Sequence, residues 1–131
     1  MKRDMELIRL ILLKIEEEYK SHNIWDLTIE GYDMEQIAYH CKMLHEAGFV
    51  SYYEGLYTMA GLEDFQVGSI TWSGHDFLDT IRDDGIWNKT KSAIKNKGLP
   101  MLVETIKTIA SAFINAAVEG TVTAIMKNGG A

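Results

Sequence analysis

The chain has 131 residues, of which 47% are hydrophobic and 24% are charged, and its formal net charge is −6. This length and composition exclude a largely disordered chain and suit one domain, or one small domain with an appended helix. The negative charge disfavours a general affinity for phosphate backbones, and the single cysteine excludes an internal disulfide.

The charges are distributed unevenly along the chain. Residues 1–85 carry 7 Lys/Arg against 17 Asp/Glu, whereas residues 86–131 carry 6 against 2. The lysines of residues 89–97 form the basic cluster available to an anionic partner, although a solvated helix end explains them equally well. Because charges interrupt the first apolar run, MKRDMELIRL shows no secretory signal, and a cytoplasmic location is expected.

Two elements are predicted before residue 32. Asp4 can cap a helix whose apolar residues recur every three or four positions, namely Met5, Ile8, Leu12, Ile15 and Tyr19. Beyond it, Trp25, Leu27 and Ile29 alternate with polar residues, which is the pattern of a half-buried strand. Gly31 is expected to end that strand.

A second helix is predicted over residues 34–47. Asp33 and Gln36 have the spacing of a capping box, and Gly48 suits a left-handed helix stop. Its buried stripe is predicted to contain Ile37, Ala38, Cys41 and Leu44, which makes Cys41 a core residue. His40 and His45 are five residues apart, so they do not share a helical face, and surface or edge positions are expected for both.

A β-hairpin is predicted next. Residues 49–54 and 66–72 are rich in strand formers, and residues 55–64 between them contain two glycines and are expected to form a long loop. The stretch TWSGHDFLDTIRDD, residues 71–84, then brings a serine, a histidine and several aspartates close together. Ser73 and Asp76 fit an acidic capping box at the start of a helix, which gives this polar cluster a structural role.

The catalytic alternative for the same stretch is weaker. His75 and Asp79 lie one helical turn apart, but two ligands without a third make a poor metal site. The chain also lacks a glycine-rich phosphate loop and a nucleophile motif. We therefore expect no catalytic residue, no metal and no cofactor, and we expect that the protein is not an enzyme.

The following residues predict two more helices. Asp83, Asp84 and Gly85 should interrupt the first helix, and a further helix should run through Ile94 to Lys97 and close at Gly98. Trp72 and Trp87 are predicted to anchor the core. Pro100 suits the first turn of a final helix, because its missing amide proton would lack a partner there.

The final segment, residues 99–126, is unusually apolar. A four-three spacing typical of helix–helix seams joins Leu102, Ile106, Ile109, Phe113 and Ala116. These residues could pack back onto the domain or bring copies of the chain together, and we expect a homo-oligomer or such intrachain packing. Residues 108–126 are also long enough to cross a membrane, but Glu119 and Asn115 disfavour membrane association.

Several motifs resemble known families. IAYHCKMLHEAGFV, residues 37–50, resembles the recognition helix of winged-helix regulators, and SITWSGHDFL, residues 69–78, is similar to the strand and helix start that follow their wing. MKRDMELIR together with TWSGHDFLDTIRDDGIWNKTK resembles DUF2513, a family of bacterial and phage proteins of unknown function. Together with the predicted elements, the resemblance, which covers residues 1 to about 95, implies an α+β fold with a winged-helix-like domain over residues 1–97 (helix, strand, helix, β-hairpin wing, helix). The apolar helical segment that follows, residues 98–131, is expected from its own spacing to serve oligomerisation or packing.

Two functions remain open from the sequence. The first is a phage- or mobile-element-associated protein-interaction module, in which the exposed face of the second helix contacts a partner through Gln36, Tyr39, Lys42 and Met43. The alternative is a DNA-binding transcriptional regulator that uses the helix 34–47 and the wing 55–66. Charge favours the first, because that helix face carries one firm positive charge and because Glu63 and Asp64 of the wing would repel phosphates.

Overall fold

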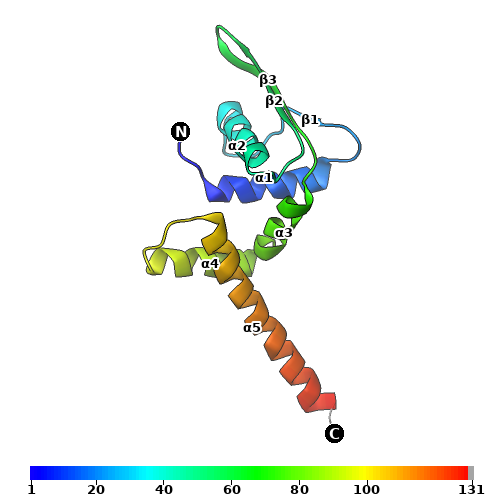
Figure 1. The fold of residues 1–131 in the computed structure, drawn as a ribbon, viewed down its shortest axis with the longest axis vertical. Helices are drawn as coiled ribbons and strands as arrows, with labels where there is room; N and C mark the ends of the chain where they lie inside the picture. The colour runs from blue at the N-terminus through cyan, green and yellow to red at the C-terminus, as the bar shows by residue number, and fades with distance from the viewer. Residues whose placement is uncertain (130–131) are drawn as a thin grey trace. The chain divides into compact units, whose positions relative to one another are not determined.

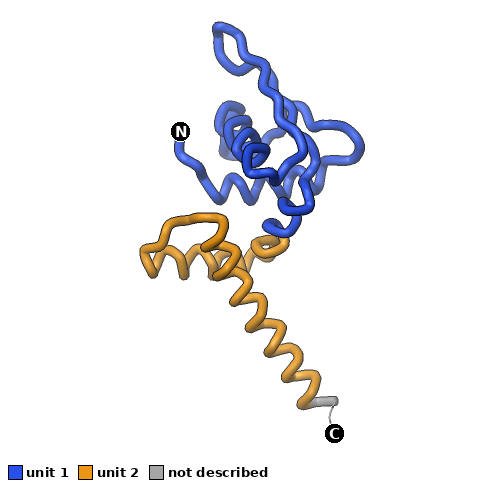
Figure 2. Tube along the Cα trace, in the orientation of Figure 1, with its two compact units in different colours: residues 1–78 blue, residues 79–131 orange. Residues whose placement is uncertain are grey.

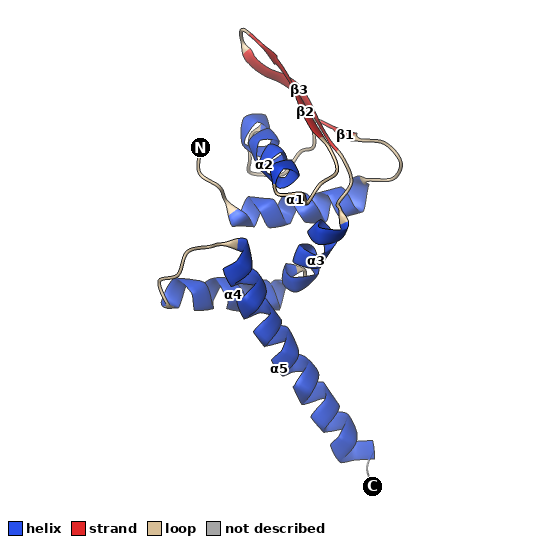
Figure 3. Ribbon diagram, in the orientation of Figure 1, coloured by secondary structure: helices blue, strands red, loops and turns tan. Residues whose placement is uncertain are grey.

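The computed structural model describes residues 1–129 and has an α+β architecture, as predicted (Figures 1 and 3). Five helices accompany one three-stranded antiparallel sheet. In chain order the elements are α1 (Met5–Glu18), β1 (Ile24–Trp25), α2 (Met34–Glu46), β2 (Tyr53–Thr58), β3 (Gly61–Val67), α3 (Trp72–Ile81), α4 (Asp84–Asn96) and α5 (Val103–Gly129).

The chain divides into two compact units, residues 1–78 and residues 79–131 (Figure 2). The first unit holds α1, α2, the sheet and most of α3, and the second holds α4 and α5. The domain boundary expected after Lys97 falls inside the second unit. It stays a prediction about which part of the chain folds by itself.

Helix α1 begins where the sequence predicts. The Asp4 carboxylate accepts hydrogen bonds from the backbone amides of Glu6, at 2.9 Å, and Leu7, at 3.3 Å. These bonds satisfy amide groups that have no partner inside the helix. The helix then buries a wide apolar face in the core of the first unit, through Met5, Leu7, Ile8, Ile11, Leu12 and Ile15.

Helix α2 also follows its prediction. The Asp33 carboxylate accepts from the Gln36 amide at 2.8 Å, and the Gln36 side chain accepts from the Asp33 amide at 3.0 Å, which completes the capping box. Gly48 ends the helix with φ +78°. The predicted stripe of Ile37, Ala38, Cys41 and Leu44 is buried.

The first strand is shorter than predicted. It contains only Ile24 and Trp25, and the Trp25 side chain is 61% exposed, so the predictions of a strand over residues 25–29 and of an inward Trp25 are wrong, although Leu27 is buried as the alternation predicted. Asp26 breaks the strand by taking φ +50°, a left-handed conformation. Its amide donates to the Phe65 carbonyl and its carboxylate accepts from the Phe65 amide, each at 2.9 Å. A side chain therefore replaces the next backbone bond of the ladder.

The hairpin exists, but its strands lie further out than expected. Strand β3 is central in the order β1-β3-β2, and β2 pairs with it from Tyr53 opposite Val67 to Thr58 opposite Gly61. The predicted loop 55–64 is therefore mostly strand, with Met59 and Ala60 forming the turn. The loop was predicted from its two glycines, but only one of them lies at the turn. Gly55 lies within β2 beside the rings of Tyr53 and Tyr57, and Gly61 takes φ +111° at the turn.

The polar cluster after β3 starts a helix, although Ser73 is not its cap. Helix α3 begins at Trp72, and the Thr71 hydroxyl accepts from the Gly74 amide at 3.1 Å, so Thr71 has the capping role predicted for Ser73. The Ser73 hydroxyl instead donates to the Gly48 carbonyl at 3.1 Å. Trp72 is 85% exposed because it lies on the outer side of this first turn, so its prediction as a core anchor is wrong.

In the second unit, Asp83 caps α4 by accepting from the Ile86 amide at 2.8 Å, which confirms a break at Asp83, whereas Asp84 and Gly85 belong to the first turn of α4 and do not interrupt a helix. Trp87 is buried as predicted, and Gly98 closes the helix region with φ +64°. Pro100 precedes α5 and does not lie in its first turn, because the helix starts at Val103. Helices α4 and α5 pack against each other near the start of α5, and the rest of α5 extends past α4 (Figure 1).

Candidate interaction surfaces

The four contact candidates of α2 occupy different environments. Tyr39 is exposed, Met43 is half-buried, and the Lys42 ammonium lies 4.0 Å from the Glu46 carboxylate. The Gln36 side chain is half-buried and completes the capping box. The face therefore offers an aromatic ring, a thioether and one lysine whose charge is compensated by a nearby glutamate.

His40 is not at the surface or at an edge, as the sequence suggested. It is 2% exposed, and its Nε2 accepts from the Asp4 amide at 2.9 Å. Its Nδ1 lies 2.7 Å from the Gln36 carbonyl oxygen, so the proton is placed on Nδ1. A helical projection could have found this position, because His40 lies three residues after Ile37 and four before Leu44, both of which are buried. His45 is exposed, as expected.

Cys41 is a buried thiol of the core. Burial raises the pKa of Cys41 to about 12, because the thiolate would lose its hydration. A thiol that stays protonated is a poor nucleophile. Among the described residues, no three His, Cys, Asp or Glu side chains gather as potential metal ligands.

The hairpin carries exposed side chains in a region most of which was expected to be loop. We call the side chains of Glu54, Leu56, Tyr57, Met59 and Asp64, which lie on both faces of the hairpin, the hairpin surface. Leu56 is 56% exposed and Tyr57 61% exposed, while Glu54 and Glu63 add negative charge beside them. No Lys or Arg occurs between Lys42 and Arg82. The hairpin therefore has no fixed positive charge of its own, and its tip extends beyond α1 and α2 of the same unit (Figure 1).

Two carboxyl groups meet at the base of this surface. A hydrogen bond with Asp26, followed by charge repulsion from the same residue, raises the pKa of Asp64 above its ordinary value of 3.8. A carboxyl whose pKa is raised by folding adds stability below pH 3.8, and that contribution is lost as the pH rises through the folded-state pKa. At neutral pH the pair is therefore expected to destabilise the first unit.

Replacing Asp64 with asparagine is expected to raise the melting temperature at pH 7 and to leave it almost unchanged at pH 3. The asparagine amide can donate to Asp26 at every pH, as the protonated Asp64 does only in acid. Differential scanning fluorimetry at both pH values measures the effect. Glu63→Gln is the matched control, because it removes a neighbouring charge without touching the Asp26 bond, and it should give a smaller gain. A lower melting temperature of Asp64→Asn at pH 7 would contradict the argument.

The second surface belongs to α5. Of its described side chains, Ile106 and Ala110 are buried, Ile109 and Phe113 are half-buried, and every residue from 115 to 127 is exposed. Leu102, which precedes the helix, and Ala116 are exposed as well. The predicted seam from Leu102 to Ala116 is therefore partly buried inside the second unit and does not form one continuous exposed face.

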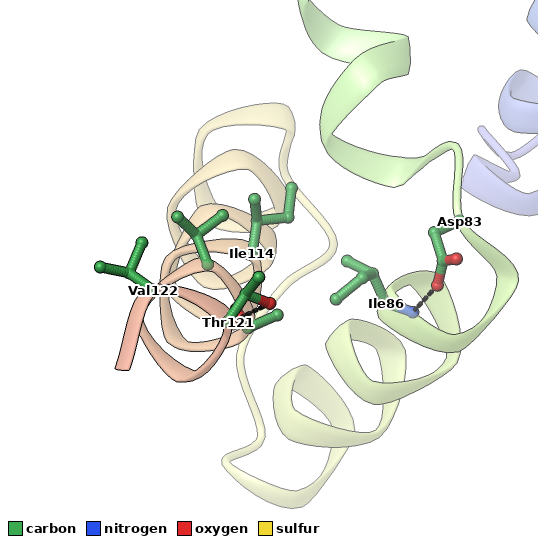
Figure 4. A pocket seen from close by; sticks show the side chains of 7 residues that line it. Asp83, Ile86, Ile114, Thr121 and Val122 are labelled. Atoms are coloured by element: carbon green, nitrogen blue, oxygen red, sulfur yellow. Dashed lines mark hydrogen bonds between the residues drawn. The ribbon is translucent and has the colours of Figure 1, made fainter. Parts of the chain in front are cut away.

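The uncovered apolar face lies further along the helix. An open groove of about 380 Å³ runs between the start of α4 and the second half of α5 (Figure 4). Asp83 and Ile86 line it on one side, and α5 contributes Ile114, Ala117, Val118, Thr121 and Val122. Ile114, Val118 and Ile125 recur at four- and seven-residue steps, so they extend the same face toward the end of the helix.

Helix α5 is also long and apolar enough to cross a membrane. The criterion of length and composition is met over Val103–Lys127, and only 6% of the apolar window is buried. A core helix of a soluble protein can meet the same criterion, but it is normally buried. Among the described residues, α5 is therefore unlike a core helix, because most of its apolar window is exposed.

Comparison with known proteins identifies relatives whose functions are not described. A family model described as "Hypothetical protein (DUF2513)" matches residues 2–100, which ends just before α5. A Haemophilus influenzae protein named "Uncharacterized protein" is 35% identical over 116 residues, which cover 88% of this chain and 97% of that protein. No solved structure matches this chain.

Proposed function

Because this chain belongs to the DUF2513 family, whose description gives no activity, we propose its function from its own geometry. It is a non-enzymatic, winged-helix-like interaction module, associated with phages or mobile elements, and it assembles into a homo-oligomer through α5. The observation that carries the proposal is the exposed apolar face of α5 from Val118 to Ile125, which continues the half-buried Ile114.

The order of elements supports the winged-helix-like scaffold. A helix, a short strand, a helix and a hairpin follow one another, and β1 pairs with the returning strand of the hairpin. Regulators with a winged helix-turn-helix have a further helix before the recognition helix. Here residues 26–33 contain a turn and no helix, so α2 lacks the helix that normally precedes and supports a recognition helix.

Charge favours a protein partner over nucleic acid. The first unit holds 6 Lys/Arg and 14 Asp/Glu, a formal net charge of −8. Phosphate binding requires several cations around the reading helix and the wing, whereas α2 offers Lys42 beside Glu46 and the hairpin offers none. Tyr39 and Met43 on α2 and the aromatic hairpin surface suit contact with protein.

Self-association explains the exposed part of α5. An apolar helix face of this length is seldom left in water, and copies of the chain could cover it by packing their faces together. Glu119 lies on a different side of the helix from Val118 and Ile125, so it can remain in water within such a bundle, whereas Asn115, three residues before Val118, lies beside their face. The same two polar groups would be costly inside a bilayer.

We expect Val118→Glu combined with Ile125→Glu to convert an oligomer into a monomer of 14.8 kDa, because each substitution would place a charge in the buried seam. Size-exclusion chromatography with light scattering measures the mass. Thr123→Glu is the matched control, since Thr123 is exposed on the opposite face of α5 and should leave the oligomer intact. If the wild-type protein is a monomer in the absence of detergent, the proposal is wrong. If the wild-type protein binds phospholipid vesicles, α5 is a membrane anchor instead.

The second candidate function is the DNA-binding regulator, which the strand order and the hairpin following α2 favour. Gel-shift assays on random genomic fragments distinguish the two functions. We expect no shift even near ~50 mM salt, where nonspecific phosphate contacts are strong. Binding that weakens steeply with added salt and is lost in Lys42→Ala would favour the regulator.

A further inference from the structure

Strand β2 lies at an edge of the sheet. In the order β1-β3-β2 it pairs with β3 on one side, and no strand of the described residues pairs with its other side. One irregularity interrupts the hairpin: Leu56 pairs with Asp64 and Tyr57 pairs with Leu62, so the extra residue is Glu63 of β3. Because the bulge belongs to β3, β2 remains regular over its six residues and keeps an unused row of amide and carbonyl groups.

This edge lacks the usual protection against pairing. Proteins commonly block an edge strand with lysine, proline or a bulge in the strand itself. None of these occurs in β2, whose sequence is YEGLYT; its one charged side chain is Glu54, and Leu56 and Tyr57 are more than half exposed. The edge is therefore chemically open to another extended chain.

The two faces of β2 differ in character. Glu54 and Leu56 lie on the same face as Asp64, which is opposite Leu56, and this face is exposed and acidic. Tyr53, Gly55 and Tyr57 lie on the other face, where Tyr53 packs near Phe65 with ring centroids 6.4 Å apart. The hydroxyls of Tyr53 and Tyr57 lie 3.2 Å apart, so the two rings enclose Gly55 and form a fixed aromatic platform.

We propose that the β2 edge binds an extended segment of a protein partner by strand addition, and that this segment alternates basic and apolar side chains. Its basic side chains would lie beside Glu54, and its apolar side chains beside Tyr53 and Tyr57. This inference deepens the proposed interaction function and rests on it. A second copy of the chain is a poorer occupant, because each first unit carries a formal charge of −8 and would repel its twin.

A labelled eight-residue peptide of alternating lysine and isoleucine, added to the full-length protein at low salt, tests the proposal. We expect saturable binding measured by fluorescence anisotropy, and slower amide hydrogen exchange in residues 53–58. The same peptide with alternate backbone nitrogens methylated should not bind, because it cannot complete the ladder. Equal binding of the methylated peptide, protection confined to other segments, or no binding at ~1 mM peptide would overturn the proposal.

Two charge reversals separate strand addition from general attraction. Glu54→Lys should weaken binding by roughly tenfold, because it places like charges opposite each other at the edge. Glu46→Lys is the matched control: it makes the same change on an exposed residue of α2 and should leave the affinity almost unchanged. The inference would be rejected if both variants weakened binding equally. It would also be rejected if the amides of residues 53–58 were already protected from hydrogen exchange by a second copy of the chain and lost that protection on dilution.

The oligomer measurement keeps the two proposals distinct. If the wild-type mass remains that of an oligomer sensitive to Val118→Glu with Ile125→Glu, but the peptide does not bind, the edge inference fails and the proposed assembly stands. If the protein is monomeric and binds DNA through α2 and the hairpin, the proposed function fails, and the edge inference fails with it.

Discussion

Replacing Gly74 with alanine is expected to lower the free energy of unfolding by about 2 kcal/mol. A Cβ atom at this position would lie 2.2 Å from the Phe49 carbonyl oxygen and 2.7 Å from the Ile70 side chain. The Phe49 carbonyl cannot move away easily, because it accepts from the Thr71 amide at 3.0 Å, and the preceding Gly48 carbonyl accepts from Ser73. The glycine of the TWSGHD motif is therefore required by the close approach of α3 to the chain after α2.

Helix propensity alone predicts the opposite result, which makes the test informative. Alanine stabilises a helix interior by about 1 kcal/mol relative to glycine. Gly120, inside α5, is the matched control, because no atom lies within 4 Å of the Cβ that alanine would add there. Gly120→Ala should increase helicity and stability.

Urea unfolding followed by circular dichroism measures both glycine variants, and the fluorescence of the three tryptophans, Trp25, Trp72 and Trp87, provides a second probe. The expected signs are opposite: Gly74→Ala shifts the midpoint to lower urea concentration, and Gly120→Ala shifts it higher or leaves it unchanged. A Gly74→Ala protein as stable as the wild type would show that the loop around Phe49 yields at little cost, and the packing argument would fail.

The elements that the sequence predicted well depend on chemistry within a few residues. Asp4, Asp33 with Gln36, and Asp83 each cap a helix through amides two or three positions away. Gly48 and Gly98 end helices by adopting a positive φ that other residues avoid. Such local interactions do not depend on the rest of the fold, so α1, α2 and α4 could be predicted from the sequence.

The strands were placed poorly because their limits depend on distant partners. Residues 25–29 alternate like a strand, yet the ladder ends where Asp26 bonds to Phe65, which is distant in sequence. The hairpin reaches Thr58 because Leu62 and Asp64 provide partners across the turn. The hydroxyls of Thr71 and Ser73 both donate to the Gly48 carbonyl, and Thr71 caps α3 because it directly precedes the first helical residue, Trp72.

The candidate surfaces also divide into those set by local sequence and those set by distant contacts. The outward face of α2 followed from helical periodicity, and Tyr39 and Lys42 are exposed there. The seam from Leu102 to Ala116 was chosen without knowing where α4 crosses α5, and the crossing buries Ile106 and leaves the face beyond Ile114 open. The hairpin was considered only as a wing for DNA, and its pairing was missed because most of its residues were assigned to a loop.

Replacing His40 with asparagine is expected to cost about 1–3 kcal/mol, because it removes the acceptor of the Asp4 amide from a nearly buried site. Asparagine can still donate to the Gln36 carbonyl from the place of Nδ1, but nothing remains at the place of Nε2. The loss matters because Asp4 caps α1 and also accepts from the Tyr32 hydroxyl at 3.4 Å. The bond between His40 and the Asp4 amide therefore joins the start of α1 to α2, and the bond between Tyr32 and the Asp4 carboxylate joins it to the turn before α2.

His40→Gln is the matched control for this bond, since the glutamine carbonyl oxygen reaches the place of Nε2 and can accept from Asp4. We expect it to retain most of the stability that His40→Asn loses, although both variants remove the ring. Urea unfolding gives the free energies, and amide hydrogen exchange at Asp4 reports directly on the bond, with fast exchange in His40→Asn and slow exchange in His40→Gln. If the two variants lose equal stability and exchange equally fast at Asp4, ring packing holds this junction together, and the acceptor at Nε2 contributes little.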